Sequence, residues 1–123
     1  MILVDTSVWI DHLRQGDSSL ANLLNAGQVL AHPFVIGELS LGNMQQRDVI
    51  LDTLNNMPRA RIATDEEVQT FINQVKLYGQ GVGYIDAHLL ASARLTPGTM
   101  LWTRDKRLSA AAKQLGLLAA IGH

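Results

Sequence analysis

The chain has 123 residues, of which 47% are hydrophobic and 17% charged, and its ten basic and eleven acidic side chains give a formal net charge of −1. This length fits a single domain over residues 1–123 with a real hydrophobic core, and the composition excludes a disordered chain. The absence of cysteine excludes disulfide scaffolds, zinc ribbons and thiol nucleophiles. The near-neutral charge argues against a large basic surface for duplex nucleic acid, but it leaves room for a small RNA site.

No apolar run in the sequence approaches the roughly 20 residues that a membrane-spanning helix needs. Residues 1–5 contain no positive region and reach an acid, Asp5, after four residues, which is not the pattern of a signal peptide. We therefore expect a cytoplasmic protein with no membrane partner.

The first half of the chain predicts two strands, each followed by helices. Residues 2–4 are a continuous apolar run, which is typical of a strand buried on both faces, and residues 28–31 predict a second strand. Asp17 is a candidate cap for one helix, and Pro33 suits the first position of another. The four expected helices cover residues 8–14, 18–26, 33–41 and 46–57.

The second half of the chain continues this alternation. Thr64 and Glu67 have the spacing of a capping box, which opens a helix running to Val75. Glycines at positions 79, 81 and 83 predict a flexible loop before an apolar helix. The expected elements are strands over residues 61–63, 99–103 and 117–121 and helices over residues 65–75, 84–95 and 106–115.

Strands that alternate with helical segments predict an α/β fold. Such segments join into right-handed β-α-β crossovers, and these give a mostly parallel sheet covered by helices. In a parallel sheet, functional sites form at the carboxyl ends of the strands. The acids that matter most are therefore those that lie at this edge, or those placed where a charge is costly.

Two acids follow predicted strands directly. Asp5 ends the first strand and Asp105 follows the strand over residues 99–103, so both are expected at the same edge of the sheet. Each also precedes a predicted helix, where capping is a common role for aspartate. Position alone leaves site and cap equally open for Asp5, and it favours the cap for Asp105.

Two further acids lie on apolar faces of predicted helices. Glu38 has Phe34, Val35 and Leu41 as helical neighbours, so its carboxylate is expected to project from an apolar stripe. A buried charge of this kind must be protonated, paired with an arginine or bound to a cation. Asp86 repeats the pattern in the first turn of its helix. An acid stabilised near the surface by the helix dipole is the alternative, but the apolar face makes it less attractive.

The four acids Asp5, Glu38, Asp86 and Asp105 are thus expected to meet near one edge of one sheet. Close carboxylates raise one another's pKa unless a cation neutralises them. In a chain without cysteine, these oxygen ligands indicate Mg²⁺ or Mn²⁺. Such ions assist the attack of water on a phosphodiester, so the residues favour phosphoryl chemistry.

At these positions the sequence resembles the PIN-domain nucleases, and in particular the VapC-like toxins of type II toxin–antitoxin modules. Four segments carry the resemblance, in the order of the family and over nearly the whole chain. They are Val-Asp-Thr-Ser-Val-Trp-Ile at 4–10, Ile-Gly-Glu-Leu-Ser-Leu-Gly at 36–42, Tyr-Ile-Asp-Ala-His-Leu-Leu-Ala at 84–91 and Leu-Trp-Thr-Arg-Asp-Lys-Arg-Leu at 101–108.

The resemblance implies a PIN-like three-layer α/β/α sandwich with a mostly parallel central sheet. It also implies a Mg²⁺- or Mn²⁺-dependent ribonuclease that cleaves single-stranded or looped RNA, a VapB-like antitoxin partner whose C-terminal segment covers the active site, and a homodimer. In such an enzyme Asp5 and Asp86 would be the most direct metal ligands. Glu38 and Asp105 would complete the acidic pocket, directly or through bound waters.

Several neighbours of these acids are candidates for supporting roles. The hydroxyls of Thr6, Ser7 and Thr103 are placed to hydrogen-bond water at the site, although capping and turn formation would explain them equally well. Three basic residues flank Asp105 and are candidates for RNA phosphates, with a solvated charged face as the alternative. These are Arg104, Lys106 and Arg107.

The aromatic and histidine residues give weaker signals. Trp9, Tyr84 and Trp102 are possible stacking platforms for RNA bases, but core packing is the commoner role of such residues. No pair of histidines has metal-ligand spacing, and His88 should point to the opposite side of its helix from Asp86.

Three other functions compete with the nuclease. A phosphorelay receiver needs a pair of adjacent acids after the first strand, where this chain has Asp5 followed by Thr6, and a late lysine, whereas Lys113 lies in a predicted helix. A haloacid-dehalogenase-like phosphatase needs an acid two residues after Asp5, where Ser7 stands. A catalytically weak PIN-like interaction domain would keep the fold without the turnover.

Overall fold

A computed structural model describes residues 1–121 and contains a parallel sheet of three short strands. The strands are β1 (Ile2–Val4), β2 (Val29–Leu30) and β3 (Met100–Trp102), in the order β2-β1-β3. In the register of the central strand, Leu3 is paired with Leu30 on one side and with Leu101 on the other. The predicted first strand is therefore the centre of the sheet, where both of its faces are covered.

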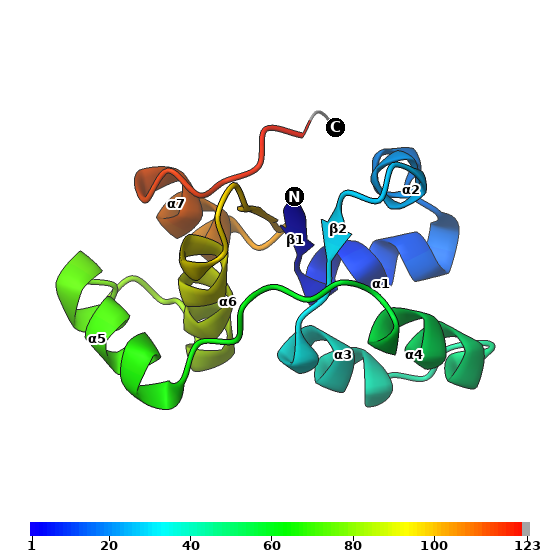
Figure 1. The fold of residues 1–123 in the computed structure, drawn as a ribbon, viewed down its shortest axis with the longest axis horizontal. Coiled ribbons are helices and arrows are strands. Elements are labelled where there is room, and N and C mark those ends of the chain that lie inside the picture. Colours follow the sequence, from blue (N-terminus) through cyan, green and yellow to red (C-terminus); the bar gives the residue numbers. More distant parts are fainter. Residues whose placement is uncertain (122–123) are drawn as a thin grey trace.

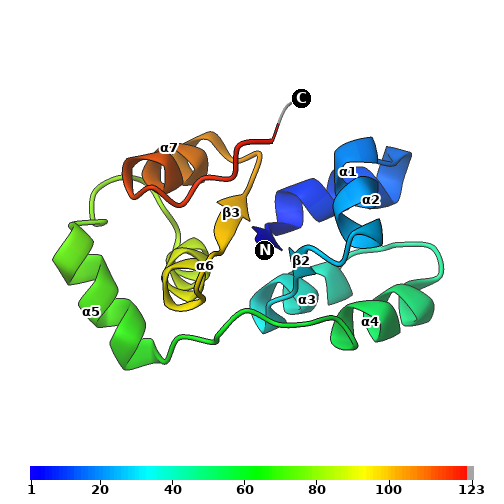
Figure 2. The same ribbon diagram turned by 45° about the horizontal axis from the view of Figure 1, so that its top comes forward.

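Seven helices connect and cover these strands (Figure 1). Figures 1 and 2 show α5, α6 and α7 on one side of the strands and α1 to α4 on the other, so the helices form two outer layers. This arrangement confirms the predicted α/β sandwich. The helices are α1 (Thr6–Gln15), α2 (Ser18–Asn25), α3 (Pro33–Ser40), α4 (Arg47–Asn55), α5 (Asp65–Val75), α6 (Tyr84–Leu95) and α7 (Lys106–Gln114).

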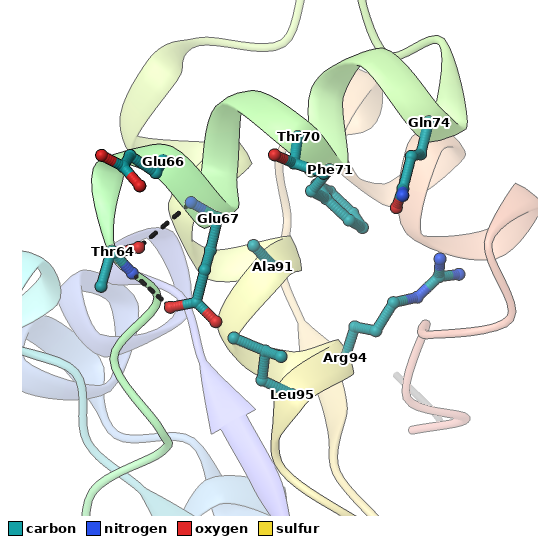
Figure 3. A pocket seen from close by; sticks show the side chains of 9 residues that line it. All are labelled: Thr64, Glu66, Glu67, Thr70, Phe71, Gln74, Ala91, Arg94 and Leu95. Carbon is teal, nitrogen blue, oxygen red and sulfur yellow. Dashed lines mark hydrogen bonds between the residues drawn. The ribbon is translucent and has the colours of Figure 1, made fainter.

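Local signals explain where several helices begin. The side chain of Asp17 accepts a hydrogen bond from the amide of Leu20, which confirms the predicted cap of α2. Pro33 opens α3 as expected. The capping box of α5 is complete, because Thr64 Oγ1 accepts from the Glu67 amide at 3.1 Å and Glu67 Oε1 accepts from the Thr64 amide at 2.9 Å (Figure 3).

The strand predicted over residues 61–63 is wrong. The chain pairs with the sheet edge only at Arg59, which forms a parallel bridge with Ala31. Beyond it, the amide of Arg61 donates to Thr96 Oγ1 at 2.8 Å and the amide of Ala63 donates to Ser92 Oγ. Side chains of the α6 region have therefore taken the backbone donors that a strand would have used.

The strand predicted over residues 117–121 is also reduced to one bridge, between Leu118 and Leu101. Leu101 donates to the carbonyl of Leu117 and accepts from the amide of Ala119. The partner strand β3 ends at Trp102, one residue after Leu101, so no further strand residues are available for pairing. Every pairing within residues 1–121 is parallel.

The core lies between the sheet and the helix layers, and α6 is its most enclosed helix. Seven consecutive residues of α6, from Ala87 to Ala93, are buried, so this helix is covered on all sides. The first turn of α6 is the exception, because Tyr84 and Ile85 are exposed and Asp86 is only half-buried. The buried body of α6 therefore fixes the position of Asp86 at its end. No helix within residues 1–121 has the length and apolar character required to cross a membrane.

Candidate active site

The edge of the sheet is tied together at Asp5. Its amide donates to the carbonyl of Trp102 at 2.9 Å, which continues the pairing of β1 with β3. Its side chain, only 6% exposed, accepts hydrogen bonds from Ser7 Oγ and from Thr103 Oγ1, each at 2.8 Å. Both donors reach the same oxygen, Oδ2, so Oδ1 takes no part in these two bonds.

Asp5 stands at the N-cap position of α1, yet its side chain makes no capping hydrogen bond. Of the two roles left open by the sequence, the cap is therefore wrong. The carboxylate is instead oriented by hydroxyls from two segments that are nearly a hundred residues apart in the chain. The carboxylate is therefore held by Ser7 and Thr103 and not by the amides of its own helix.

The predicted supporting hydroxyls are assembled around this point. Ser7 Oγ accepts from the amide of Arg104 at 3.0 Å, and Thr103 Oγ1 accepts from the amide of Asp105 at 3.1 Å. The turn after β3 is thus fastened to the turn after β1. Thr6 faces another neighbour, since its hydroxyl donates to Glu38 Oε1 at 2.7 Å.

Glu38 is exposed, and the expectation that it projects from a buried stripe is wrong. Of its apolar neighbours on α3, only Val35 is buried, whereas Phe34 is 37% exposed and Leu41 is 90% exposed. The sequence pattern failed because α3 packs through one face only, with Val35, Ile36 and Leu39. Glu38 reaches the site through Thr6 rather than through burial.

Asp86 gives the strongest electrostatic signal. Burial at the start of α6, followed by the negative charges of three other carboxylates, raises the pKa of Asp86 to about 6, while a hydrogen bond from the Gly83 backbone opposes the shift. In decreasing order of effect, the three carboxylates are those of Asp5, Asp105 and Glu38. The four predicted acids therefore lie close enough for their charges to affect Asp86, and we call them the acidic cluster.

Asp105 combines the two roles considered for it. Its Oδ1 accepts from the amide of Leu108 at 2.9 Å, so it caps α7. It is also close enough to contribute to the raised pKa of Asp86. The cap holds the carboxylate at the carboxyl end of β3, beside the turn that carries Thr103.

The acidic cluster has the chemistry of a site for a hard divalent cation. All four donors are carboxylates, and their mutual repulsion at Asp86 is the property that a cation would relieve. Within residues 1–121, no group of three acidic or histidine side chains is already placed to enclose a metal ion. The anchored carboxylate of Asp5 and the exposed, rotatable side chains of Glu38 and Asp105 fit a site that closes around the ion.

Arg104, a candidate for RNA contact, is engaged within the protein. Its guanidinium bridges the carboxylates of Asp11 and Asp17 and lies 5.7 Å from the centre of the Trp102 ring. The Leu20 amide holds the pKa of Asp17 below its usual value, and Arg104 adds to this effect. We call Arg104 with Asp11 and Asp17 the clamp. The sequence does not predict it, because no local spacing links Asp11 to an arginine 93 residues away.

The other two basic candidates, Lys106 and Arg107, are exposed at the start of α7. Arg107 lies against the loop before α6, at Gly81. A Cβ at Gly81 would stand 2.8 Å from Arg107 Cδ, and the backbone there has a φ of +75°. The positive φ favours glycine at position 81, whereas the flexible side chain of Arg107 could move away from a Cβ.

The aromatic and histidine residues are mostly structural. Trp9 and Trp102 are buried, whereas Tyr84 is 46% exposed at the start of α6. Burial, with the nearby His88 and Arg59, lowers the pKa of His32 to about 4, so this ring is neutral near pH 7. His88 packs edge-on against Phe34 and Tyr84, and its Nε2 lies 3.4 Å from Asp65 Oδ1.

Figure 3 shows a hollow elsewhere on the molecule, between α5 and α6. It measures about 380 Å³ and shares no residue with the acidic cluster. A groove of about 470 Å³ does reach the cluster, because Glu38 forms part of its wall. Its apolar lining comes from Ile10, Leu13, Leu39, Met44 and Ile50.

Comparison with known proteins agrees with this geometry. The chain matches the PIN domain family over residues 2–114. It is 49% identical over 120 residues to Ribonuclease VapC32 from two strains of Mycobacterium tuberculosis, covering 98% of this chain and 97% of the relative. The crystal structure of FitAcB from Neisseria gonorrhoeae shares its fold, with a TM-score of 0.62 and 24% identity over 92% of this chain and 94% of that chain.

These likenesses leave the receiver and phosphatase alternatives without support. They confirm the family that the four sequence segments indicated, and the family match spans all four members of the acidic cluster. The chain belongs to the PIN-domain family and, within it, to the VapC ribonucleases.

Proposed function

We propose that this protein is the toxin of a type II toxin–antitoxin module, a Mg²⁺- or Mn²⁺-dependent endoribonuclease that hydrolyses phosphodiester bonds in single-stranded or looped RNA. The ribonuclease relative of nearly equal length supports the class of reaction. The observation that carries the proposal is the position of four carboxylates close enough to affect one another, with Asp5 held at the sheet edge by Ser7 and Thr103 and the pKa of Asp86 raised to about 6. Such a group is typical of a metal-dependent active site.

Within this proposal, Asp5 and Asp86 hold the metal ion, and Glu38 and Asp105 complete its surroundings directly or through water. When bound, such an ion activates water for attack and stabilises the negative charge that develops on the phosphate. Ser7 and Thr103 fix the orientation of Asp5 by donating to Oδ2, which leaves Oδ1 for the ion. Thr6 orients Glu38 through its hydroxyl.

The proposed substrate contacts lie on the β3 side of the acidic cluster. Lys106 and Arg107 are exposed directly after Asp105, where they can meet phosphates of the RNA strand. Arg104 takes a supporting role, since its guanidinium is already shared between Asp11 and Asp17.

The proposed protein partner is a VapB-like antitoxin that acts in the cytoplasm, and the active toxin is a homodimer over the single domain of residues 1–123. The apolar groove beside Glu38 suits an amphipathic segment of this antitoxin. An arginine on that segment would pair with the acidic cluster, because its planar group binds carboxylates in a bidentate manner.

The decisive experiment is digestion of single-stranded RNA by the purified protein with Mg²⁺, with Mn²⁺ and with a chelator. Cleavage should require a divalent ion and should be lost in Asp5→Asn, while Asp52→Asn, which changes an exposed acid of α4, should behave as the unmodified protein. Absence of cleavage by the unmodified protein with both ions would instead favour the catalytically weak interaction domain.

A further inference from the structure

A further hollow lies on the exposed face of α7, next to the turn that follows β3. It measures about 420 Å³ and is lined by residues from α7 and from the turn that precedes it. We call it the α7 trough. Its lining residues are Thr103, Arg104, Lys106, Ser109, Ala110 and Lys113.

The helical spacing explains the shape of the α7 trough. Four of its residues, at positions 106, 109, 110 and 113, repeat at intervals that place them along one face of a helix. Ser109 and Ala110 are small and make a low floor, with Lys106 and Lys113 at its two ends. Seven residues at 1.5 Å each separate the two lysines by about 10 Å along the helix axis.

The charge of the trough is uncompensated. The sequence of α7 contains Lys106, Arg107 and Lys113 but no acid. Within residues 1–121, no acidic side chain forms an ion pair with either lysine of the trough. The wall provided by Arg104 differs, because Asp11 and Asp17 already neutralise that guanidinium. Within the described residues, Lys106 and Lys113 are therefore the charges lining the trough that have no ion-pair partner.

The turn after β3 links the α7 trough to the acidic cluster, although none of the four acids lines the trough. Thr103 lines the trough and donates its hydroxyl proton to Asp5 Oδ2 at 2.8 Å. Asp105, which contributes to the raised pKa of Asp86, immediately precedes Lys106. An RNA strand that leaves the acidic cluster along α7 would therefore meet the ammonium groups of Lys106 and Lys113.

We propose that the α7 trough binds two neighbouring phosphates of the RNA strand, on one side only of the phosphate that is cleaved. This inference rests on the proposed function. It adds Lys113 to the RNA contacts and restricts them to one flank of the cleaved phosphate. The lining offers ammonium groups and hydroxyls and lacks large apolar side chains, which suits a phosphate backbone better than an amphipathic protein segment. Because Lys106 and Lys113 both lie on the α7 side of the acidic cluster, only the flank of the RNA on that side gains affinity from them.

The chain provides a matched control for testing this site, because it contains only three lysines. Two of them form the ends of the trough, and the third, Lys76, is exposed at the end of α5. Lys106→Gln, Lys113→Gln and the double variant would be compared with Lys76→Gln, which removes the same charge elsewhere. All four would carry Asp86→Asn, so that binding of a single-stranded RNA can be measured without cleavage.

Lys106→Gln and Lys113→Gln should each weaken RNA binding about fivefold at 0.1 M salt. Each should also reduce the slope of log affinity against log salt by about 0.7, and the double variant should show both losses. Lys76→Gln should leave both values unchanged. Equal losses for all three lysines would overturn the proposal, because they would reflect net charge rather than a site. Unchanged binding in the double variant would overturn it as well.

Neutral methylphosphonate links in the RNA test which phosphates the trough binds. Moved one position at a time along the substrate, they should weaken binding at two neighbouring links on one flank, and these two should no longer matter in the double variant. If the affinity lost through the neutral links simply adds to the affinity lost through the lysine substitutions, the lysines do not contact those phosphates. Loss of affinity for an antitoxin without loss for RNA would assign the trough to a protein partner and overturn the proposal.

Failure of this inference can be told apart from failure of the proposed function. If the unmodified protein cleaves RNA with Mg²⁺ or Mn²⁺ and the trough variants bind RNA normally, the function stands and the α7 trough does not. If the unmodified protein cleaves no RNA but binds it through the two lysines, the trough stands and the nuclease does not.

Discussion

Two groups of carboxylates lie at the same end of this molecule, and the protein treats them in opposite ways. Asp11 and Asp17 share the guanidinium of Arg104, and the pKa of Asp17 is lowered. In the acidic cluster, burial with like charges raises the pKa of Asp86 to about 6. The comparison distinguishes acids that hold the turn after β3 in place from acids that repel one another and that we propose bind a cation.

The contrast is sharpened by how close the two groups are in sequence. Arg104 belongs to the clamp and the next residue, Asp105, belongs to the acidic cluster. The clamp fixes the turn, and the fixed turn presents Thr103 and Asp105 to the site. Structural and functional charges are therefore separated by the direction of the side chains and not by distance along the chain.

The largest effect is expected from Asp86→Asn on catalysis. The substitution keeps the shape of the side chain and removes one charge and one proposed ligand, so RNA cleavage should fall by about 100-fold or more. Initial rates with saturating Mn²⁺ and circular dichroism of the same samples would measure activity and folding. Unfolding of this variant would contradict the comparison, since it would make Asp86 a structural acid.

Arg104→Gln should damage stability more than any substitution in the acidic cluster. It leaves two half-buried carboxylates without a partner, which should lower the free energy of unfolding by about 2 kcal/mol once solvent screening is allowed for. Urea unfolding would measure the loss, with Arg61→Gln as the exposed control. Loss of RNA affinity with unchanged stability would show that Arg104 serves the substrate instead.

A smaller effect of opposite sign is expected for Asp86→Asn without metal. The folded-state pKa of Asp86 is raised to about 6, above the unfolded value of 3.8. Its contribution to stability is therefore fully present below pH 3.8 and is lost as the pH rises through about 6. After discounting for partial exposure, the variant should be about 1 kcal/mol more stable than the unmodified protein at pH 7.

The two proteins should converge in stability as the pH falls toward 4, which unfolding curves at a series of pH values would reveal. Asp52→Asn provides the control for a carboxylate outside the cluster. A stability difference that stays constant from pH 4 to pH 7 would show that Asp86 does not titrate in the predicted range.

The smallest effect concerns metal binding in the absence of RNA. Millimolar Mg²⁺ or Mn²⁺ should raise the melting temperature at pH 7 by a few degrees, because an ion that binds only the folded state stabilises it by mass action. The increase should shrink below about pH 6, where protons compete for Asp86. An equal increase in the Asp86→Asn variant would place the bound ions elsewhere.

Much of the acidic cluster was predictable because its members occupy positions with a local meaning. Asp5 and Asp105 follow strands that apolar runs made visible, and Asp86 opens a helix whose apolar residues continue beyond it. The prediction for Glu38 reached the right residue through a wrong argument. The periodicity of α3 does not tell which apolar residues are covered, and Leu41 proved to be 90% exposed.

The short strands show a similar limit. The short segments over residues 61–63 and 117–121 are predicted as strands from their place in the alternation of strands and helices, but a strand also needs a partner of sufficient length. Thr96 and Ser92 draw the backbone of the first segment away from the sheet, and the early end of β3 limits the second to one bridge. These partners come from distant parts of the chain and leave no mark on the local pattern.

The sequence by itself determined the α/β alternation, the helix starts at Asp17, Pro33 and Thr64, and the family, because these depend on residue type and spacing along the chain. Only the tertiary structure decided which charges are compensated. Whether an arginine reaches Asp11 or Asp86 depends on how segments some ninety residues apart are packed. Electrostatic energy depends on distance in space, so the difference between the clamp and the acidic cluster emerges only once the fold has placed them.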